Sequence, residues 1–443
     1  MHTLLYRSRP NDKLEDDALR FLSSIDDDKS ILYYDIVGSQ AHSIMLHDMG
    51  HITSSELKKI LSALEEAKKN PAKVQIEGYE DIHEALEAFV IKHAGMNAGG
   101  KMHTARSRND QVVLDIRMKI RDDINEICAA LSSLVQGLVE RAKESKQVPM
   151  LMYTHLQQAQ IGTFSHFLLS YAYGLMRDME RLYLAYHRIN QSPLGACAIG
   201  GSSIAIDRKR TAMLLGFDSI IKNSIDATSS RDAFIEYAST LAILTSTLGR
   251  IAEDFIIWST TEFGYIELAE PYTSTSSAMP QKKNPKIMDH VVRSLQINKE
   301  RMRQAASTSY AIALDIAEQL VMQKNITFRT AHRIVGALVN KATSKGNISL
   351  VKLEFADATS VLKAHKVDVN PDELMKIING MTPEKSLEAR KSSGSPNLLE
   401  QEEMIKSLSQ GISNYCVGIQ KRTKMIEGSF DNLERTIKNY LEL

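Results

Sequence analysis

The chain has 443 residues, and its 54 Lys and Arg residues balance 54 Asp and Glu residues, so the formal net charge is zero. This length allows two or three domains with a large core, and it excludes a small stapled scaffold or a disordered chain. A balanced charge gives no reason to expect nucleic acid or a membrane surface as a partner. The three Cys residues are far apart in the sequence, which indicates no metal pair or disulfide framework and a reducing, cytoplasmic compartment.

The N-terminal part predicts short helices. Residues 1–17 mix basic and acidic side chains without the apolar stretch of a secretory signal. From there to about residue 105 the pattern indicates shorter helical pieces, with a break at 95–100 that contains Gly and Asn.

Long helices are predicted in the middle of the chain. Residues 101–136 contain neither Pro nor Gly, and apolar side chains recur every three or four positions from Val113 to Leu138. Less regular patterns of the same kind cover 164–189, 233–257 and 287–312, which favours a bundle of long helices.

The uncharged stretch 148–176 is long enough to cross a bilayer. Its His, Gln and Thr side chains would be costly in lipid, so we expect a helix buried in protein.

Pro and Gly become frequent after Gly346 and divide the chain into shorter segments. We therefore expect an all-α protein of three domains. These are an N-terminal helical domain (1–105), a central long-helix bundle (106–350) and a small C-terminal helical domain (351–443).

A polar segment with three prolines, residues 271–285, lies between two of the predicted helices. Its composition predicts a loop, and loops on a rigid bundle often carry function. Small hydroxyls next to Lys282, Lys283 and Asn284 are suited to holding an anion or activating a hydroxyl. A plain polar linker is the alternative.

Two further clusters fall at predicted helix starts. In 103–111, Thr104 or Ser107 can cap the long helix, and Arg106 and Arg108 near its positive end favour a carboxylate site. The alternative is a solvated, capped helix start. In 153–160, His155 is the candidate, although a lone buried His is more often structural. A fourth polar segment, 21–42, alone indicates only a polar helix and turn.

These segments resemble a known superfamily. The loop 276–285 reads SSAMPQKKNP and is similar to the SSxMPxKxNP signature of the fumarase/aspartase superfamily. Within it, the segments HTARSRNDQ at 103–111 and YTHLQQAQ at 153–160 resemble the argininosuccinate lyases. Further matches occur along nearly the whole chain, among them 21–39, 80–83, 193–195, 206–232, 263–264 and 328–336.

The resemblance implies a mainly α-helical homotetramer with a central twenty-helix bundle, in which each active site is built from three subunits. The implied reaction is the reversible elimination of fumarate from argininosuccinate, which leaves arginine and serves arginine biosynthesis. It needs no metal or organic cofactor.

The resemblance also assigns roles to residues. Ser276 and His155 form the acid–base pair, in either order, and Asp289 replaces the Glu that partners the His. Lys282 and Asn284 stabilise the developing aci-carboxylate. The residues implied to contact substrate are Ser24, Ser107, Arg108, Asn109 and Thr154.

The sequence departs from the family pattern at several points. Thr275 and Ala105 replace glycines. A stretch resembling PLAYNxDxQEDK has no clear counterpart. A gapless alignment keeps its Lys as Lys324, which we count among the substrate contacts, but has Ile316 and Val321 in place of a Tyr and a Gln.

Two alternatives remain at this point. One is a lyase that releases fumarate from another N-succinyl amine, adenylosuccinate included, but no Gly-rich phosphate loop is evident. The other is a catalytically silent, crystallin-like structural relative. Ser276, Lys282, Asn284 and His155 are all retained. A catalytically silent protein has no physical need for this costly set of polar residues, so their retention argues against that alternative.

Overall fold

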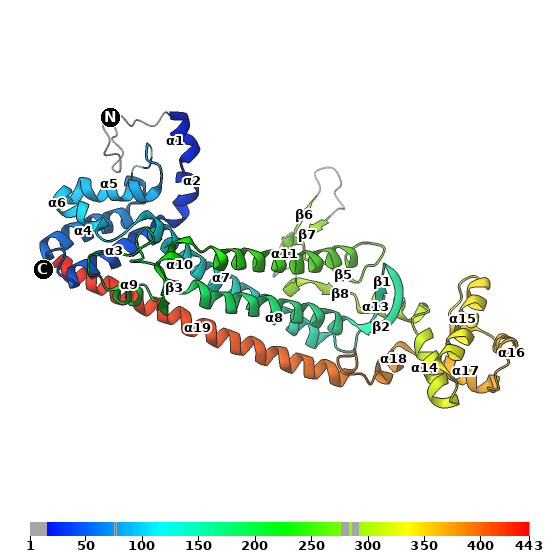
Figure 1. The fold of residues 1–443 in the computed structure, drawn as a ribbon. Coiled ribbons are helices and arrows are strands. Elements are labelled where there is room, and N and C mark those ends of the chain that lie inside the picture. Colours follow the sequence, from blue (N-terminus) through cyan, green and yellow to red (C-terminus); the bar gives the residue numbers. More distant parts are fainter. Residues whose placement is uncertain (1–15, 75, 77, 276–282, 286–291, 443) are drawn as a thin grey trace. The chain divides into compact units, whose positions relative to one another are not determined.

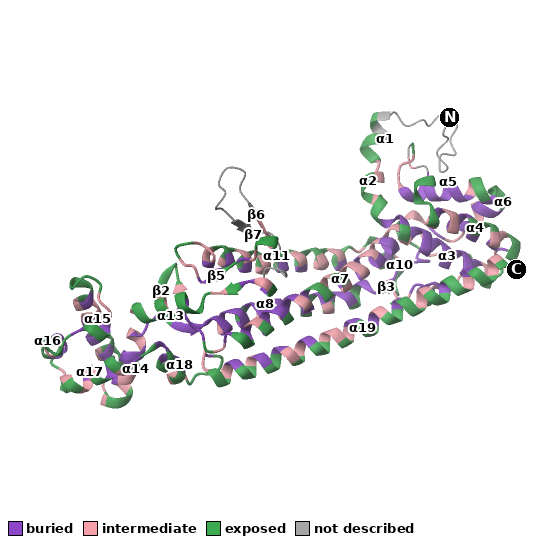
Figure 2. Cartoon of the chain, turned by 180° about the vertical axis from the view of Figure 1, so that it is seen from behind, coloured by how far each residue is buried: buried purple, intermediate pink, exposed green. Residues whose placement is uncertain are grey.

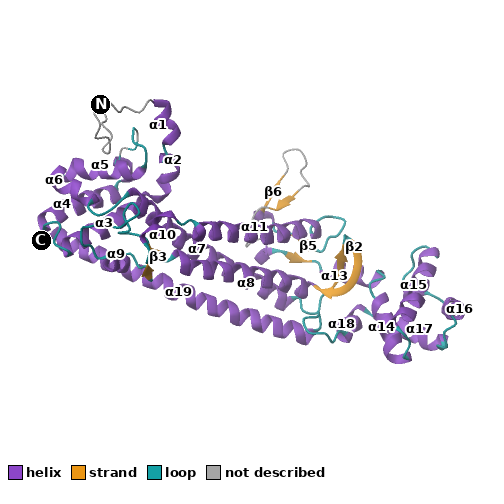
Figure 3. Cartoon of the chain, in the orientation of Figure 1, coloured by secondary structure: helices purple, strands orange, loops and turns teal. Residues whose placement is uncertain are grey.

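The computed structural model describes residues 16–74, 76, 78–274 and 292–442. Of residues 275 and 283–285 it describes the backbone alone. Helices account for most of these residues, and the described strands form only two-stranded pairs (Figure 3). The all-α prediction is therefore confirmed. No helix in the described residues is both long enough and apolar enough to cross a membrane.

The chain divides into two compact units (Figure 1). Unit 1 comprises residues 1–129, 180–241 and 416–443, and unit 2 comprises 130–179 and 242–415. The boundaries fall inside four long helices: α7 (Arg108–Glu144), α8 (Phe164–Ile189), α11 (Asp232–Trp258) and α19 (Leu398–Glu442). The division into three domains stays a prediction.

Unit 1 contains a core of short helices. After α1 (Asp16–Leu22) and α2 (Ile25–Asp28) come α3 (Leu32–Asp48), α4 (Ser54–Lys69), α5 (Ile82–Ala94) and α6 (Met96–Gly99). Figure 2 shows the buried faces of α3, α4 and α5, whose fully buried side chains include Ile44, Leu61 and Leu86. Gly99 lets α6 approach α5, because a Cβ there would lie 2.8 Å from the Cα of Ile91.

The remaining elements of unit 1 are short. They are α9 (Arg208–Leu214), α10 (Ser224–Ser229) and the parallel pair β3 (Gln191–Ser192) and β4 (Ser219–Ile220).

Three of the four predicted long helices are confirmed as α7, α8 and α11. The fourth, expected over 287–312, is wrong in its described part. There β8 (Gln296–Ile297) pairs with β5 (Ile266–Glu267), and α13 covers only Lys299–Thr308. Asn298 starts this new helix, since its side chain accepts a hydrogen bond from the backbone N–H of Arg301 at 3.1 Å.

A buried helix was also expected from residue 148, and this is wrong up to residue 163. Strands β1 (Pro149–Thr154) and β2 (Gln157–Thr163) form an antiparallel hairpin, and α8 begins only at Phe164. His155 and Leu156 turn the chain with φ of 52° and 57°. The polar run therefore lies at an exposed tip, which avoids the cost of burying it, while Leu151 and Ile161 pack in the core.

The rest of unit 2 includes a group of helices around an apolar core. These are α14 (Ala313–Lys324), α15 (Phe328–Ser344), α16 (Phe355–His365), α17 (Pro371–Gly380) and α18 (Pro383–Ala389). The chain ends in one helix of 45 residues, α19, although only shorter segments were expected after Gly346. Strands β6 (Thr273–Thr275) and β7 (Lys283–Pro285) pair antiparallel.

Candidate active site

The start of α7 is held by hydrogen bonds. Of the two candidate caps, Ser107 occupies the capping position, because its hydroxyl accepts from the backbone N–H of Asn109 at 3.3 Å. The carboxylate of Asp110 accepts from the N–H of Ser107 at 3.0 Å, and from those of Gly195 and Cys197 at 2.9 and 2.7 Å. The positive end of this helix is thus fixed in place, ready to attract an anion.

Arg108 and Asn109 extend from this helix start toward neighbouring segments of unit 1. The guanidinium of Arg108 pairs with the carboxylate of Asp81, which also caps α5 by accepting from the N–H of Glu84 at 2.8 Å. The amide of Asn109 donates to the carbonyl of Ala198 at 2.9 Å.

Ser24 lies beside the same segment. Its backbone N–H donates to the carbonyl of Glu80 at 3.1 Å, and its hydroxyl donates to Asp28 at 2.6 Å. Asp28 in turn accepts from the N–H of Ile82 at 3.4 Å. Residues 80–82 therefore connect Ser24 to Arg108. Unit 1 thus brings together four of the predicted substrate contacts, Ser24, Ser107, Arg108 and Asn109.

A buried charge cluster lies behind this site. The Nδ1 atom of His83 is 3.0 Å from a carboxylate oxygen of Asp35 and 3.5 Å from one of Asp115. All three side chains are essentially inaccessible to solvent. Because Asp35 belongs to α3, His83 to α5 and Asp115 to α7, one imidazole ties three helices together.

Hydrogen bonds join this cluster to the helix start. Gln111 donates to Asp35 at 2.5 Å, and Arg106 donates to the hydroxyl of Ser39 at 2.8 Å. Ser39 donates to Asp35 at 3.4 Å. Arg106 and Gln111, which flank the segment 107–109, are thereby hydrogen-bonded to α3. Sequence reasoning missed this role; the only signals were the match at 80–83 and the polar positions within 21–42.

Burial and charge act against each other in the cluster. Burial alone would raise the pKa of Asp35, but the charge of His83, with help from Arg106 and the hydrogen bond from Gln111, lowers it to about 2. Burial lowers the pKa of His83, yet the two carboxyl groups raise it overall. Burial and the charge of Asp35 raise the pKa of Asp115 well above its usual range. We therefore interpret the cluster as an imidazolium–carboxylate pair of His83 and Asp35, with the carboxyl group of Asp115 beside it and its charged form disfavoured.

The same three residues have the donor types and spacing of a cation site, since one donor atom from each lies within 4.8 Å of the others. A bound cation is not needed for neutrality, however. The imidazolium of His83 and the guanidinium of buried Arg106 already supply positive charge to the carboxyl groups.

His42 faces the segment between Arg106 and the preceding helix. Its Nε2 atom is 2.8 Å from the carbonyl of Thr104. Burial, with the charge of Arg106, lowers the pKa of His42 to about 3, so the folded protein holds it neutral. Ala105, which follows Thr104, has φ of 54°. This left-handed conformation favours glycine and is strained for alanine.

The candidate residues of the hairpin lie in unit 2. Thr154 and His155 are exposed at the tip of the β1–β2 hairpin. Next to the tip, Tyr153 anchors the hairpin, because its hydroxyl is 2.9 Å from that of Tyr265 and its ring lies against Trp258. A rigid hairpin thus presents the imidazole of His155 to solvent.

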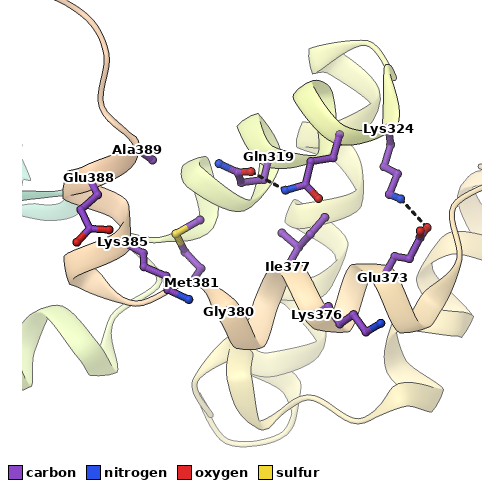
Figure 4. A pocket seen from close by; sticks show the side chains of 11 residues that line it. Gln319, Lys324, Glu373, Lys376, Ile377, Gly380, Met381, Lys385, Glu388 and Ala389 are labelled. Carbon is purple, nitrogen blue, oxygen red and sulfur yellow. Dashed lines mark hydrogen bonds and ion pairs between the residues drawn. The ribbon is translucent and has the colours of Figure 1, made fainter.

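Lys324 ends α14 and lies in a cavity of about 590 Å³ between α14, α17 and α18. Its ammonium group is 2.6 Å from the carboxylate of Glu373 (Figure 4). The side chain predicted to hold substrate is therefore engaged in an ion pair within unit 2.

The segment 276–289, which carries the predicted catalytic residues, falls largely outside the described residues. Ser276, Lys282 and Asp289 all lie there. Asn284 belongs to β7, where its backbone pairs with Ser274 of β6. The two described ends of the loop are therefore held side by side.

Comparison with known proteins identifies the class. The family model described as "Lyase" matches residues 14–296, and the one described as "Argininosuccinate lyase C-terminal" matches 310–386. The chain is thus a lyase of the fumarase/aspartase superfamily. The argininosuccinate lyase of Nitrosopumilus maritimus is 46% identical over 98% of this chain and 99% of its own length. The chain belongs to the argininosuccinate lyase family.

Other comparisons agree. The argininosuccinate lyase of Methanocaldococcus jannaschii is 33% identical over 96% of this chain and 97% of its own length. A crystal structure of EDDS lyase in complex with formate has a TM-score of 0.86 and 26% identity, with 93% of this chain and 92% of that chain covered. The alignment with the Nitrosopumilus maritimus protein spans 487 positions, so that relative contains residues without a counterpart in this 443-residue chain.

Replacing His83 tests the buried cluster. His83→Asn should lower the free energy of unfolding by about 3 kcal/mol, because it leaves Asp35 buried without its cation. Urea unfolding monitored by circular dichroism measures this loss. His93→Asn, an exposed position on the same helix, is the control. Equal and small effects of the two substitutions would contradict the role given to His83.

His42 predicts a pH dependence. The unfolded chain binds a proton at this residue near its ordinary pKa of 6.5, whereas the folded protein does so only near 3. Stability from His42 is therefore present above pH 6.5 and is lost as the pH falls, by up to about 1.4 kcal/mol per pH unit.

The variant His42→Gln should remove this contribution and flatten the curve of unfolding free energy against pH between about pH 6 and about pH 4. The exposed control His93→Gln should keep the steeper curve. Parallel curves for His42→Gln and the unmodified protein would disprove the assignment.

Proposed function

We propose that this chain is an argininosuccinate lyase, which eliminates fumarate from argininosuccinate to leave arginine. The observation that carries the proposal is the helix start at 107–109, folded as an anion-attracting site with Ser24 beside it, in a chain 46% identical to a named argininosuccinate lyase. The succinyl carboxylates of the substrate are the natural ligands of such a site.

The reaction removes a proton from the carbon next to a carboxylate, and negative charge then builds up on that carboxylate. Fixed cations and hydrogen-bond donors must stabilise this charge, and we assign this to Lys282 and Asn284. Ser276 and His155 exchange protons with the substrate, one as base and one as acid, and this help contributes about 10²–10⁴-fold. Asp289 supports His155.

The arginine half of the substrate needs a separate account. Ile316 is fully buried in the apolar core of unit 2, and Val321 packs against that core. Neither position is suited to present a Tyr or Gln to a ligand. We infer that the stretch resembling PLAYNxDxQEDK is absent from this chain rather than substituted at these positions. The longer alignment with the relative is consistent with this. Lys324, taken from the same gapless alignment, stays a prediction as a substrate contact.

Self-association is expected from α11. This helix is rich in apolar residues, yet Ile235, Ile243 and Ile256 are 64%, 45% and 42% exposed in the single chain. An apolar surface of this kind marks an interaction site. We propose that copies of the chain cover it in a homotetramer, with active sites shared between three subunits.

We also infer a cytoplasmic location. Cys128, Cys197 and Cys416 form no disulfide, as expected in a reducing compartment. The alternatives of a lyase acting on another N-succinyl amine and of a silent structural relative are less well supported, because the named relatives at 46% and 33% identity are all argininosuccinate lyases.

The activity can be tested directly. The purified protein should release fumarate from argininosuccinate, followed by its ultraviolet absorbance, and not from adenylosuccinate. Ser276→Ala should lower kcat by at least about 10²-fold because it removes one partner of the proton transfer. The neighbouring Thr273→Ala, at the described base of the loop, is the control and should keep most of the activity. Release from adenylosuccinate alone, or full activity of Ser276→Ala, would contradict the proposal.

The assembly makes a second prediction. Ile243→Glu should reduce the molar mass measured by light scattering below that of a tetramer, since it buries a charge in the proposed contact. Leu399→Glu, at a position 74% exposed on α19, should leave the mass unchanged. A single-chain mass for the unmodified protein would rule out the assembly.

A further inference from the structure

Unit 1 contains a cavity that none of the predicted site residues lines. It has a volume of about 1080 Å³ and lies between α9, the segment 216–222 and the C-terminal part of α19. Figure 1 shows α9 beside α19. On α19, the lining residues Lys424, Met425, Gly428 and Asn432 recur at helical spacing and so form one face. The size is that of cavities that hold small organic molecules.

The lining carries an excess of positive charge. Lys209, Lys222 and Lys424 come from three separate segments, and Asp218 is the single carboxylate among the lining residues. Within the described residues, none of the three ammonium groups lies within 4.0 Å of a carboxylate. A buried cation adds to this field, since the guanidinium of Arg121 is 4.8 Å from the centre of the Phe217 ring. Such a cavity attracts an anion.

The rest of the lining is mainly apolar. Phe217 and Ala212 are buried, and Met213 and Met425 are each 55% exposed. The turn beneath it is tightly built, because Gly216 has φ of 69° and a Cβ there would lie 3.3 Å from the backbone of α19 at Ile426. Methionine side chains adapt to ligands of varied shape. The lining therefore combines exposed cationic side chains, here called the rim, with apolar side chains, here called the base.

We propose that this cavity binds an amphiphilic organic anion, with its carboxylate or phosphate on the three lysines and its apolar body on Phe217, Met213 and Met425. An anion without an apolar body gains nothing from the base, and an apolar molecule without charge gains nothing from the rim. Both parts are needed for affinity.

Isothermal titration of the full-length protein tests the proposal with three probes: decanoate, adenosine monophosphate and inorganic phosphate. At least one of the two organic anions should bind about tenfold more tightly than inorganic phosphate. Binding of decanoate indicates an aliphatic carboxylate as the natural ligand, and binding of the nucleotide indicates an aromatic phosphate.

Paired variants make the test specific. Lys222→Met with Lys424→Met should weaken binding of that anion at least about tenfold. The matched control is Lys421→Met with Lys438→Met, two exposed lysines on α19 that do not line the cavity; it should bind like the unmodified protein.

Equal affinities for all three probes would overturn the proposal, and so would unchanged binding in the Lys222→Met and Lys424→Met protein. If no probe binds the unmodified protein and the Lys222→Met and Lys424→Met protein has a changed molar mass, the proposal is also overturned. The cavity would then be assigned to contact between copies of the chain. None of these results depends on lyase activity.

Discussion

The contact between His83 and the carboxyl groups of Asp35 and Asp115 is the interaction on which the rest of the site depends. It joins α3, α5 and α7 at a point from which water is excluded. The first turn of α7, with Ser107, Arg108 and Asn109, has its position because the residues around it are bonded to this cluster. A buried charged group is costly unless it is paired. The packing of α3, α5 and α7 and the charge state of the cluster therefore depend on each other.

In the proposed mechanism, the two units contribute different parts of the chemistry. Unit 1 offers a rigid, positively polarised helix end suited to carboxylates, held by backbone and side-chain bonds. Unit 2 offers an imidazole at an exposed hairpin tip and the ends of the loop that carries the proposed serine. His155 is exposed in the single chain, so in the proposed tetramer its surroundings come from other copies of the chain. The exposed apolar face of α11 supplies a physical reason for those copies to associate.

Sequence periodicity predicted α7, α8 and α11 closely, because each buries a continuous apolar stripe. It failed at 148–163, where absence of charge suggested a buried helix but left-handed residues at His155 and Leu156 produce a hairpin. It also missed α19, since polar residues on its exposed face hide the periodic apolar positions. The capping role of Ser107 was predictable from local chemistry. The cluster of Asp35, His83 and Asp115 was not, because pairing between residues of three separate helices leaves no local pattern.

The most direct test of this account is a double-mutant cycle between Asp35→Asn and His83→Asn, with the free energy of unfolding measured for each protein. If the two side chains form the buried ion pair that holds α7, the double variant will be more stable than the sum of the single losses implies, by about 1–3 kcal/mol. Losses that add to within about 0.5 kcal/mol would show that the two residues act independently, and the account of how the site is positioned would be wrong.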